Sequence, residues 1–594
     1  MFGLLPSTRV APALAMFALL SGSVAPLSAQ VKPGQPNEVV KRGGPVRCGL
    51  ESGEIRRPAQ FISKQPKSGS TAVQSRVAMP PPPVMVSPPP PPVVTMHNAA
   101  PVAADATRMA VGRLMPFPSP QPEMRERYAG KEVEGIKSTL AAPVSTFSVD
   151  VDTGSYANVR RFLSQGQMPP AAAVRTEEML NYFRYDYPTP ADRSQPFAVS
   201  TDMTLTPWNP DTRLLRIGIK GFDLPKTKRP PANLVFLVDV SGSMASPDKL
   251  PLVRSALSML AERMSPQDRI SIVVYAGAAG IVLEPTNQPA YVRAALDCLE
   301  AGGSTAGGQG MELAYATARA HFIRGGVNRV IMATDGDFNV GISSNEGIEA
   351  IVKKNREAGI SLTCLGFGQG NYNEAMMERV ADIGNGNYAY IDSAIEAEKV
   401  LDQERDATLF TIAKDVKIQV EFNPAVVSEY RLIGYENRAL AEEDFDNDRV
   451  DAGDIGAGHQ VTALYELVPV NGKGWLPVRR YDQRERGAPS TTVKEMAWLK
   501  LRYKLPDGDQ SRLIEQPLTA KLITTARAPQ GDMAFVAAVA GFGQKLRNDK
   551  YLGNFSYADV GRLAGAQNGY LREEFIKLAG LADKSDITAK ASSR

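Results

Sequence analysis

The order of apolar and polar positions divides the chain into a stretch of short, mainly apolar runs and flanks in which apolar and polar residues alternate. The mainly apolar runs lie at residues 234–238, 270–275, 329–333 and 362–367. Strands buried on both faces have this pattern, as in a parallel sheet covered by helices. Between the runs, apolar residues recur at helical spacing in 250–264 and 311–322. Residues 229–405 are therefore predicted to form an α/β domain with a doubly wound, mostly parallel, Rossmann-like sheet.

The flanks show the two-residue alternation of half-buried antiparallel strands. Such alternation occurs at residues 197–205, 215–219, 416–422 and 497–503. Each flank alone supplies few strands, whereas together they supply enough to cover two faces. We therefore expect one β-sandwich built from both flanks, with the α/β domain inserted into it, because insertion is tolerated where chain ends lie close together.

Helices are expected at both ends of the folded region. Asp152 or Thr153 can cap one amphipathic helix, and Thr176 can cap the next. Asp150 and Asp152 are interpreted as capping carboxylates without a chemical role. Near the C-terminus, apolar helical segments occur around residues 533–546, 557–563 and 575–581. The β-rich region is therefore expected to carry terminal helices.

The first 29 residues have the pattern of a secretory signal peptide. One basic residue, Arg9, precedes a charge-free apolar stretch that ends in small residues, and cleavage is expected after Ala29. An uncleaved N-terminal membrane anchor is the alternative, although prolines and a glycine within this stretch would interrupt a spanning helix. The sequence therefore predicts a periplasmic, secreted or cell-surface protein.

Five segments are expected along the chain. The first two segments are the signal peptide at 1–29 and a proline-rich disordered linker at 30–125. They are followed by a helix and strand region at 126–228, the α/β domain at 229–405, and a β-rich and helical region at 406–594. The linker is inferred from uninterrupted prolines at 80–83 and 88–92, which favour an extended polyproline II conformation.

Composition and charge exclude several classes of function. The 67 basic and 64 acidic residues nearly cancel and no dense Lys/Arg run occurs, so nucleic acid is not an expected partner. After the signal segment, no stretch is apolar over enough residues to span a bilayer. The three cysteines cannot form a disulfide framework. The HExxH, GxSxG and phosphate-loop motifs are absent from the sequence, so the usual parts of hydrolases and ATPases are missing.

Hard oxygen donors follow three of the predicted buried strands. They are Asp239, Ser241 and Ser243 in the sequence DVSGS, Thr305 in GGST, and Asp335 in TDG. Ligands of open α/β sheets bind where the carboxyl ends of the strands meet, so we expect these donors on loops at one edge, outside the core. An oxygen-only donor set suits Mg²⁺, Ca²⁺ or Mn²⁺ better than Zn²⁺. The alternative is that DVSGS is only a turn stabilised by its own side chains.

The three motifs together resemble the metal-ion-dependent adhesion site of von Willebrand factor type A (VWA) domains. This resemblance implies that Ser241, Ser243 and Thr305 bind the cation through their hydroxyls, with Asp239 and Asp335 close by. It also implies a protein partner that offers an acidic side chain to the cation. Segments such as DVDTGSYANVRRFL, EEMLNYFRYDYP and GNFSYADVGRLA are similar to those of bacterial YfbK-like VWA proteins, from about Ser145 to the C-terminus.

The leading hypothesis is an exported, cation-dependent binding protein for adhesion or envelope assembly, without enzymatic activity. A metal-assisted hydrolase that uses the same cation is one alternative, and a structural envelope component with a vestigial metal site is another. Asp444, Asp446 and Asp448 suggest a calcium loop, but the glycine and glutamate of an EF-hand are missing at the required positions. This segment is interpreted as a solvated acidic loop.

Overall fold

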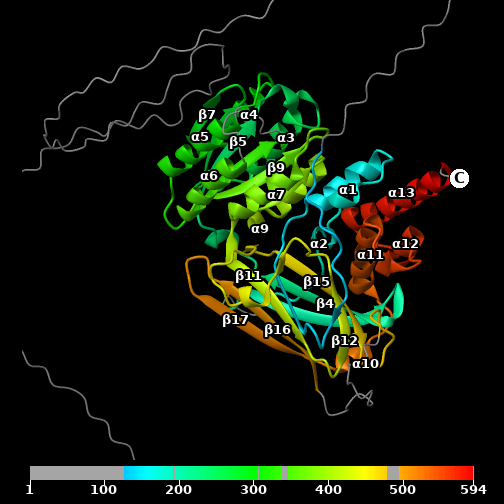
Figure 1. The fold of residues 1–594 in the computed structure, drawn as a ribbon. Helices are drawn as coiled ribbons and strands as arrows, with labels where there is room; N and C mark the ends of the chain where they lie inside the picture. The colour runs from blue at the N-terminus through cyan, green and yellow to red at the C-terminus, as the bar shows by residue number, and fades with distance from the viewer. Residues whose placement is uncertain (1–125, 191–193, 306, 337–344, 478–493, 593–594) are drawn as a thin grey trace, which may run out of the picture. The chain divides into compact units, whose positions relative to one another are not determined.

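The computed structural model describes residues 126–190, 194–305, 307–336, 345–477 and 494–592. The predicted signal peptide at 1–29 and the predicted linker at 30–125 lie outside the described residues. The described strands form three sheets, which differ in the order of their strands (Figure 1).

The predicted α/β domain contains a six-stranded sheet with the order β10-β9-β8-β5-β6-β7. Its strands are β5 (Ala232–Asp239), β6 (Arg269–Tyr275), β7 (Ala279–Thr286), β8 (Val327–Thr334), β9 (Ser361–Phe367) and β10 (Tyr388–Ile391). The strands from β10 to β6 run parallel, and β7 pairs antiparallel with β6. The doubly wound, mostly parallel sheet is thus confirmed, while the sequence pattern missed β7 and β10.

Helices cover both faces of this sheet, which is drawn in green in Figure 1. The longer ones are α3 (Leu250–Glu262), α4 (Pro289–Asp297), α5 (Gly307–Ala320), α6 (Asn345–Glu357) and α7 (Glu374–Ile383). Because alternate side chains of a strand point to opposite faces, Phe236 and Val238 of β5 pack in one apolar cluster with α3 and α4. Val235 and Leu237 pack in another with α5, α6 and α7. Every residue of β5 is buried, as its wholly apolar run predicts.

Two antiparallel sheets form the β-rich region. One has the order β1-β12-β15-β4-β3, and the other has the order β13-β2-β11-β16-β17, with β14 paired to β11. The bounds are β1 (Lys137–Ser138), β2 (Val144–Ser148), β3 (Phe197–Thr206), β4 (Asn209–Gly221), β11 (Thr411–Phe422), β12 (Val427–Ile433), β13 (Ala439–Leu440), β14 (Ile455–Gly456), β15 (Gln460–Pro469), β16 (Glu495–Lys504) and β17 (Ser511–Thr519).

Both sheets mix strands from before and after the α/β domain. In one sheet β4 pairs with β15, and in the other β2 pairs with β11. The two sheets pack on each other through aromatic rings, with 5.2 Å between the ring centroids of Phe422 and Tyr465. The expected sandwich with an inserted α/β domain is therefore confirmed by the strand pairing.

The terminal helices pack together in a separate apolar cluster with the sandwich. They are α1 (Gly154–Ser164), α2 (Thr176–Asn181), α11 (Gly531–Leu546), α12 (Tyr557–Ala564) and α13 (Tyr570–Ser592). Shorter helices are α8 (Ala394–Glu398), a π-helix (Lys399–Gln403), α9 (Arg405–Leu409) and α10 (Lys521–Thr525). None of the helices in the described part of the chain is long and apolar enough to cross a membrane.

The predicted helix caps are wrong. Thr153 occupies the N-cap of α1 but makes no side-chain cap, and Thr176 is the first residue of α2, whose N-cap is Arg175. Asp152 does not cap α1, because its carboxylate accepts hydrogen bonds from the Tyr388 amide at 2.8 Å and from Arg438 at 3.2 Å. Long-range partners have replaced the local cap.

Candidate metal centre

Asp239 lies at the centre of the candidate site because it is the last residue of β5, the strand between β6 and β8. One carboxylate oxygen accepts a hydrogen bond from the Ser241 amide at 2.9 Å, and the other accepts one from the Thr334 hydroxyl at 3.1 Å. Thr334 ends β8, so two strand ends hold this carboxylate. Burial raises the pKa of Asp239 to about 6, although hydrogen bonds from Ser241 oppose the rise.

Backbone hydrogen bonds tie the DVSGS loop to the loop that carries Thr305. The Gly242 amide donates to the Gly303 carbonyl at 3.0 Å, and the Gly302 amide donates to the Val240 carbonyl at 2.8 Å. Gly303 has a φ of +82°, a conformation that favours glycine. Thr305 follows two residues later and is buried. The two loops therefore form one hydrogen-bonded unit at the carboxyl edge of the sheet.

The two serines of the motif point their hydroxyls at each other, with 3.1 Å between Ser241 Oγ and Ser243 Oγ. Ser241 is buried whereas Ser243 is exposed. Asp239 and Asp335 have no exposed surface. Asp335 lies on the loop after β8, as expected, whereas Asp239 is the last residue of β5. The expectation that the donors lie outside the core is wrong for both aspartates, because neighbouring strand ends and loops bury them.

Asp335 has a charged partner that the sequence did not predict. Lys249 Nζ donates to Asp335 Oδ2 at 2.9 Å, and Asn371 Nδ2 donates to the same oxygen at 3.3 Å. Asn371 follows β9, so the rule that ligands gather at strand ends could have pointed to it. Lys249 directly precedes α3, a position at which a lysine is ordinarily solvated, so nothing in the sequence marks it.

The donor set is of the kind that hard divalent cations prefer. It combines two carboxylates with three hydroxyls, and hydroxyl and carboxylate oxygens suit Mg²⁺, Ca²⁺ and Mn²⁺. Within the described ranges there is no group of three or more His, Cys, Asp or Glu side chains that could hold a metal ion. A cation at this edge of the sheet would therefore depend on Ser241, Ser243 and Thr305 as well as on the aspartates.

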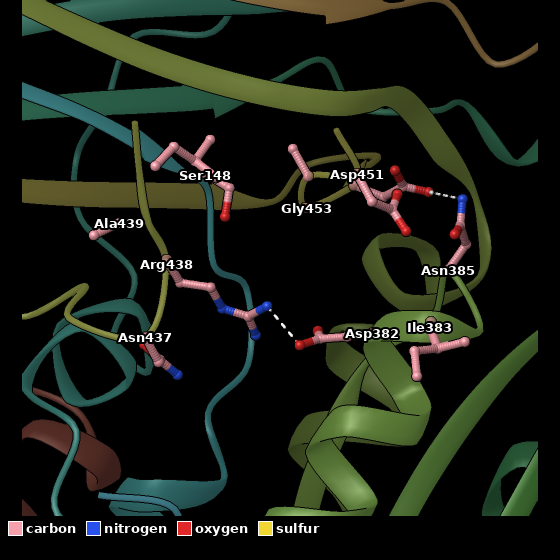
Figure 2. Close-up of a pocket in the computed structure, with 13 residues that line it drawn as sticks. Ser148, Asp382, Ile383, Asn385, Asn437, Arg438, Ala439, Asp451 and Gly453 are labelled. Atoms are coloured by element: carbon pink, nitrogen blue, oxygen red, sulfur yellow. Dashed lines mark hydrogen bonds and ion pairs between the residues drawn. The ribbon is translucent and has the colours of Figure 1, made fainter. Parts of the chain in front are cut away.

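A second polar region joins the α/β domain to the sandwich around a cavity of about 240 Å³ (Figure 2). In Figure 2 the Arg438 guanidinium points towards Asp382 at the end of α7, at 2.6 Å. Arg438 also lies 3.3 Å from Asp150 and 3.2 Å from Asp152. Burial raises the pKa of Asp454, which also lines the cavity, to about 7. Asp150 and Asp152 thus bind an arginine at the boundary between the α/β domain and the sandwich, whereas the sequence predicted only a capping role for them.

The acidic loop lies at the surface, as expected. Asp446 and Asp448 form ion pairs with Arg502 at 3.1 and 3.0 Å, and their side chains are 84% and 45% exposed. Solvated pairs of this kind contribute little to stability.

Comparison with known proteins assigns the class and then the family. A family model described as von Willebrand factor type A domain matches residues 233–403, one described as von Willebrand factor matches 122–216, and one described as the C-terminal part of the uncharacterised protein YfbK matches 407–584. A solved von Willebrand factor type A structure from Catenulispora acidiphila covers 60% of this chain and 80% of its own, with a TM-score of 0.34 and 14% identity. The fold and the family model define a VWA-domain protein.

The uncharacterised protein YfbK of Escherichia coli is 49% identical over 469 residues, which are 77% of this chain and 81% of that protein. The chain belongs to the YfbK family. An uncharacterised protein of Synechocystis is 29% identical over 187 residues, 31% of this chain and 43% of that protein. VWA domains mediate protein interactions, so the match assigns the chain to that broad class of function.

Proposed function

We propose that the VWA domain binds a divalent cation, Mg²⁺ or else Ca²⁺ or Mn²⁺, and through it an acidic side chain of a protein partner. The residues proposed to hold the cation are Asp239, Ser241, Ser243, Thr305 and Asp335. The observation that carries the proposal is that the ends of β5 and β8 meet the loop between α4 and α5, which carries Thr305. There the Ser241 and Ser243 hydroxyls lie 3.1 Å apart beside the buried Asp239 carboxylate.

The charge balance of the site supports this role. The Asp239 carboxylate is buried and accepts hydrogen bonds from two neutral donors, the Ser241 amide and the Thr334 hydroxyl, and its pKa is raised to about 6. A bound dication would supply the missing counter-charge, and neutral hydroxyl ligands would leave it with net positive character for an incoming carboxylate. The chain's own groups thus favour binding of an acidic partner, and we propose no catalytic step.

The proposed setting is the periplasm or the cell surface, where the protein would serve adhesion or the assembly of an envelope complex. The support is the N-terminal sequence, in which a basic residue, an apolar stretch and small residues end at Ala29.

The test of the cation site is a calorimetric titration with Mg²⁺ of the wild type and of Asp239→Ala. We expect saturable binding to the wild type and none to the variant, because the variant loses a charged ligand. Asp297→Ala is the matched control, since Asp297 lies on α4 of the same domain with a side chain that is 71% exposed. Binding by Asp239→Ala equal to the wild type would show that the site is wrongly assigned.

The test of the partner is a pull-down from envelope extract in Mg²⁺ and in a chelator. We expect a protein that is retained by the wild type in Mg²⁺ and released by the chelator, and that Asp239→Ala does not retain. Retention that is independent of the cation and of Asp239 would contradict the proposal.

A further inference from the structure

A buried lysine lies inside the candidate metal centre. Lys249 is 6% exposed, and its ammonium lies 2.9 Å from Asp335 Oδ2. Asp335 has no exposed surface. A buried ammonium is costly unless it is paired and hydrogen-bonded, so the position of Lys249 needs a structural reason.

The surrounding loop is shaped to accept this side chain. A Cβ atom added to Gly368, in the loop after β9, would lie 2.3 Å from both Cγ and Cε of Lys249. Gly368 has a φ of +73°, which also favours glycine. Asn371 of the same loop accepts a hydrogen bond from Lys249 Nζ at 3.1 Å through Oδ1 and donates to Asp335 through Nδ2. Three strand-end loops therefore hold the ammonium against Asp335.

The lysine changes the charge of the site. Asp239 and Asp335 together carry two negative charges, and Lys249 reduces the total to one. A dication in this site would then leave a net charge of plus one, whereas without the lysine the net charge would be zero. The ammonium also repels a cation that approaches Asp335, and this repulsion is strong because the groups are buried.

We propose that Lys249 is an internal counter-cation of the metal centre: it neutralises Asp335 in the cation-free domain and competes with the divalent cation. This inference rests on the proposed cation site. Lys249 stabilises the cation-free domain, because it removes an uncompensated buried carboxylate, and it raises the cation concentration at which the site fills.

The experiment measures Mg²⁺ affinity by calorimetry and thermal stability with and without Mg²⁺, in the wild type and in Lys249→Met. Methionine keeps the length of the apolar stem and removes the charge. We expect Lys249→Met to bind Mg²⁺ about tenfold more tightly or better, because a buried like charge has been removed. Its cation-free form should melt at a lower temperature than the wild type, and Mg²⁺ should raise its melting temperature by a larger amount.

Two further variants make the comparison specific. Lys353→Met is the matched control, since Lys353 is an exposed lysine on α6 of the same domain, and its Mg²⁺ affinity should equal that of the wild type. Lys249→Gln keeps a hydrogen-bond donor towards Asp335 without the charge and should behave as Lys249→Met does. It carries the test if the methionine variant does not fold.

The outcomes separate the two proposals. Absence of Mg²⁺ binding in both the wild type and Lys249→Met would refute the cation site itself. Binding by the wild type with equal or weaker binding by the Lys249 variants would overturn only the role of the lysine. Unfolding of both Lys249 variants that Mg²⁺ does not reverse would also overturn it, because a cation should replace the missing charge beside Asp335.

Discussion

At the scale of single residues, the five proposed ligands differ in charge and therefore in how much each is expected to contribute to cation affinity. Asp239 is charged, buried and hydrogen-bonded to Ser241 and Thr334, whereas Thr305 is neutral and contributes one hydroxyl. Electrostatic attraction to a dication depends chiefly on the carboxylates, while the hydroxyls complete the coordination. Substituting the ligands one at a time should therefore reduce the cation affinity by different amounts.

Thr305→Ala should weaken Mg²⁺ binding less than Asp239→Ala does, because it removes a neutral ligand. It should still impair binding of the acidic partner if the threonine hydroxyl belongs to the arrangement that accepts the ligand. Calorimetric titration and pull-down in Mg²⁺ measure the two effects separately. Ser304→Ala is the control, since Ser304 is the exposed hydroxyl next in sequence. A loss of cation affinity as complete as that of Asp239→Ala would contradict this ranking.

The same residue scale gives an expectation for stability. Asp239→Ala removes hydrogen bonds to the Ser241 amide and the Thr334 hydroxyl, but it also removes a buried carboxylate whose pKa is raised to about 6. These effects oppose each other, so the melting temperature in chelator should change by no more than about 4 °C. Outright unfolding of Asp239→Ala would show that the residue is primarily structural.

At the scale of elements, α2 and α7 meet through a buried cluster of carboxyl groups around Arg175. Arg175 lies 2.7 Å from Glu178 of α2 and 3.2 Å from Glu374 of α7. The Ser155 amide of α1 also donates to Glu178, and Asn158 donates to Glu374. Burial raises the pKa of Glu374 to about 8 and that of Glu178 to about 7. Both groups therefore hold a proton more tightly in the folded protein than in the unfolded chain.

This difference predicts how stability depends on pH. Between about pH 4.5 and pH 8 the folded state binds more protons at these carboxyls than the unfolded state does, so their contribution to the free energy of unfolding falls as the pH rises through this window. Glu374→Gln keeps a neutral hydrogen-bonding group and should become more stable relative to the wild type as the pH increases from 5 to 8.5.

Thermal melts across that pH range check the prediction, with Glu262→Gln as the control, because the Glu262 side chain is 54% exposed. The difference in melting temperature between Glu374→Gln and the wild type should grow with pH, and the difference for Glu262→Gln should stay constant. A Glu374→Gln difference that is independent of pH, or that shrinks as the pH rises, would contradict the raised pKa.

At the scale of the whole molecule, the inserted VWA domain is joined to the sandwich by charged contacts as well as by the chain. Arg438 lies beside β13 of the sandwich and binds Asp382 of the VWA domain (Figure 2). It also binds Asp150 and Asp152, which precede α1. The Arg438 side chain is only 11% exposed. Removing one member of a buried ionic network leaves the others uncompensated, which is more costly than breaking a surface pair.

Arg438→Ala should therefore lower the free energy of unfolding by about 3–5 kcal/mol. Arg502→Ala, which breaks the pairs with the exposed Asp446 and Asp448, should lower it by less than about 1 kcal/mol. Denaturant unfolding of both variants measures the two values. Equal losses of unfolding free energy in the two variants would show that the ionic network around Arg438 stabilises the protein no more than a surface ion pair does.

Elements with a strong local pattern could be predicted from the sequence alone. The mainly apolar runs predicted the central strands of the VWA sheet, because a strand buried on both faces is apolar at nearly every position. The alternating segments predicted the sandwich strands, and DVSGS and TDG lie at strand ends as predicted. GGST does not, because it lies in the loop between α4 and α5. The strands β7 and β10 were missed, because β7 is a partly exposed edge strand and β10 is only four residues long.

Which charged groups meet could not be predicted without the tertiary fold. Lys249 reaches Asp335 across 86 positions of the chain, and Arg438 reaches Asp150 across 288. Asp152 could have capped a helix locally, but an arginine and an amide from distant segments bind its carboxylate instead. Hydrophobic periodicity reports which face of an element is buried, whereas the partner of a buried charge depends on how the elements are placed against one another. The fold class could therefore be predicted from the sequence, whereas the electrostatics of the candidate metal centre could not.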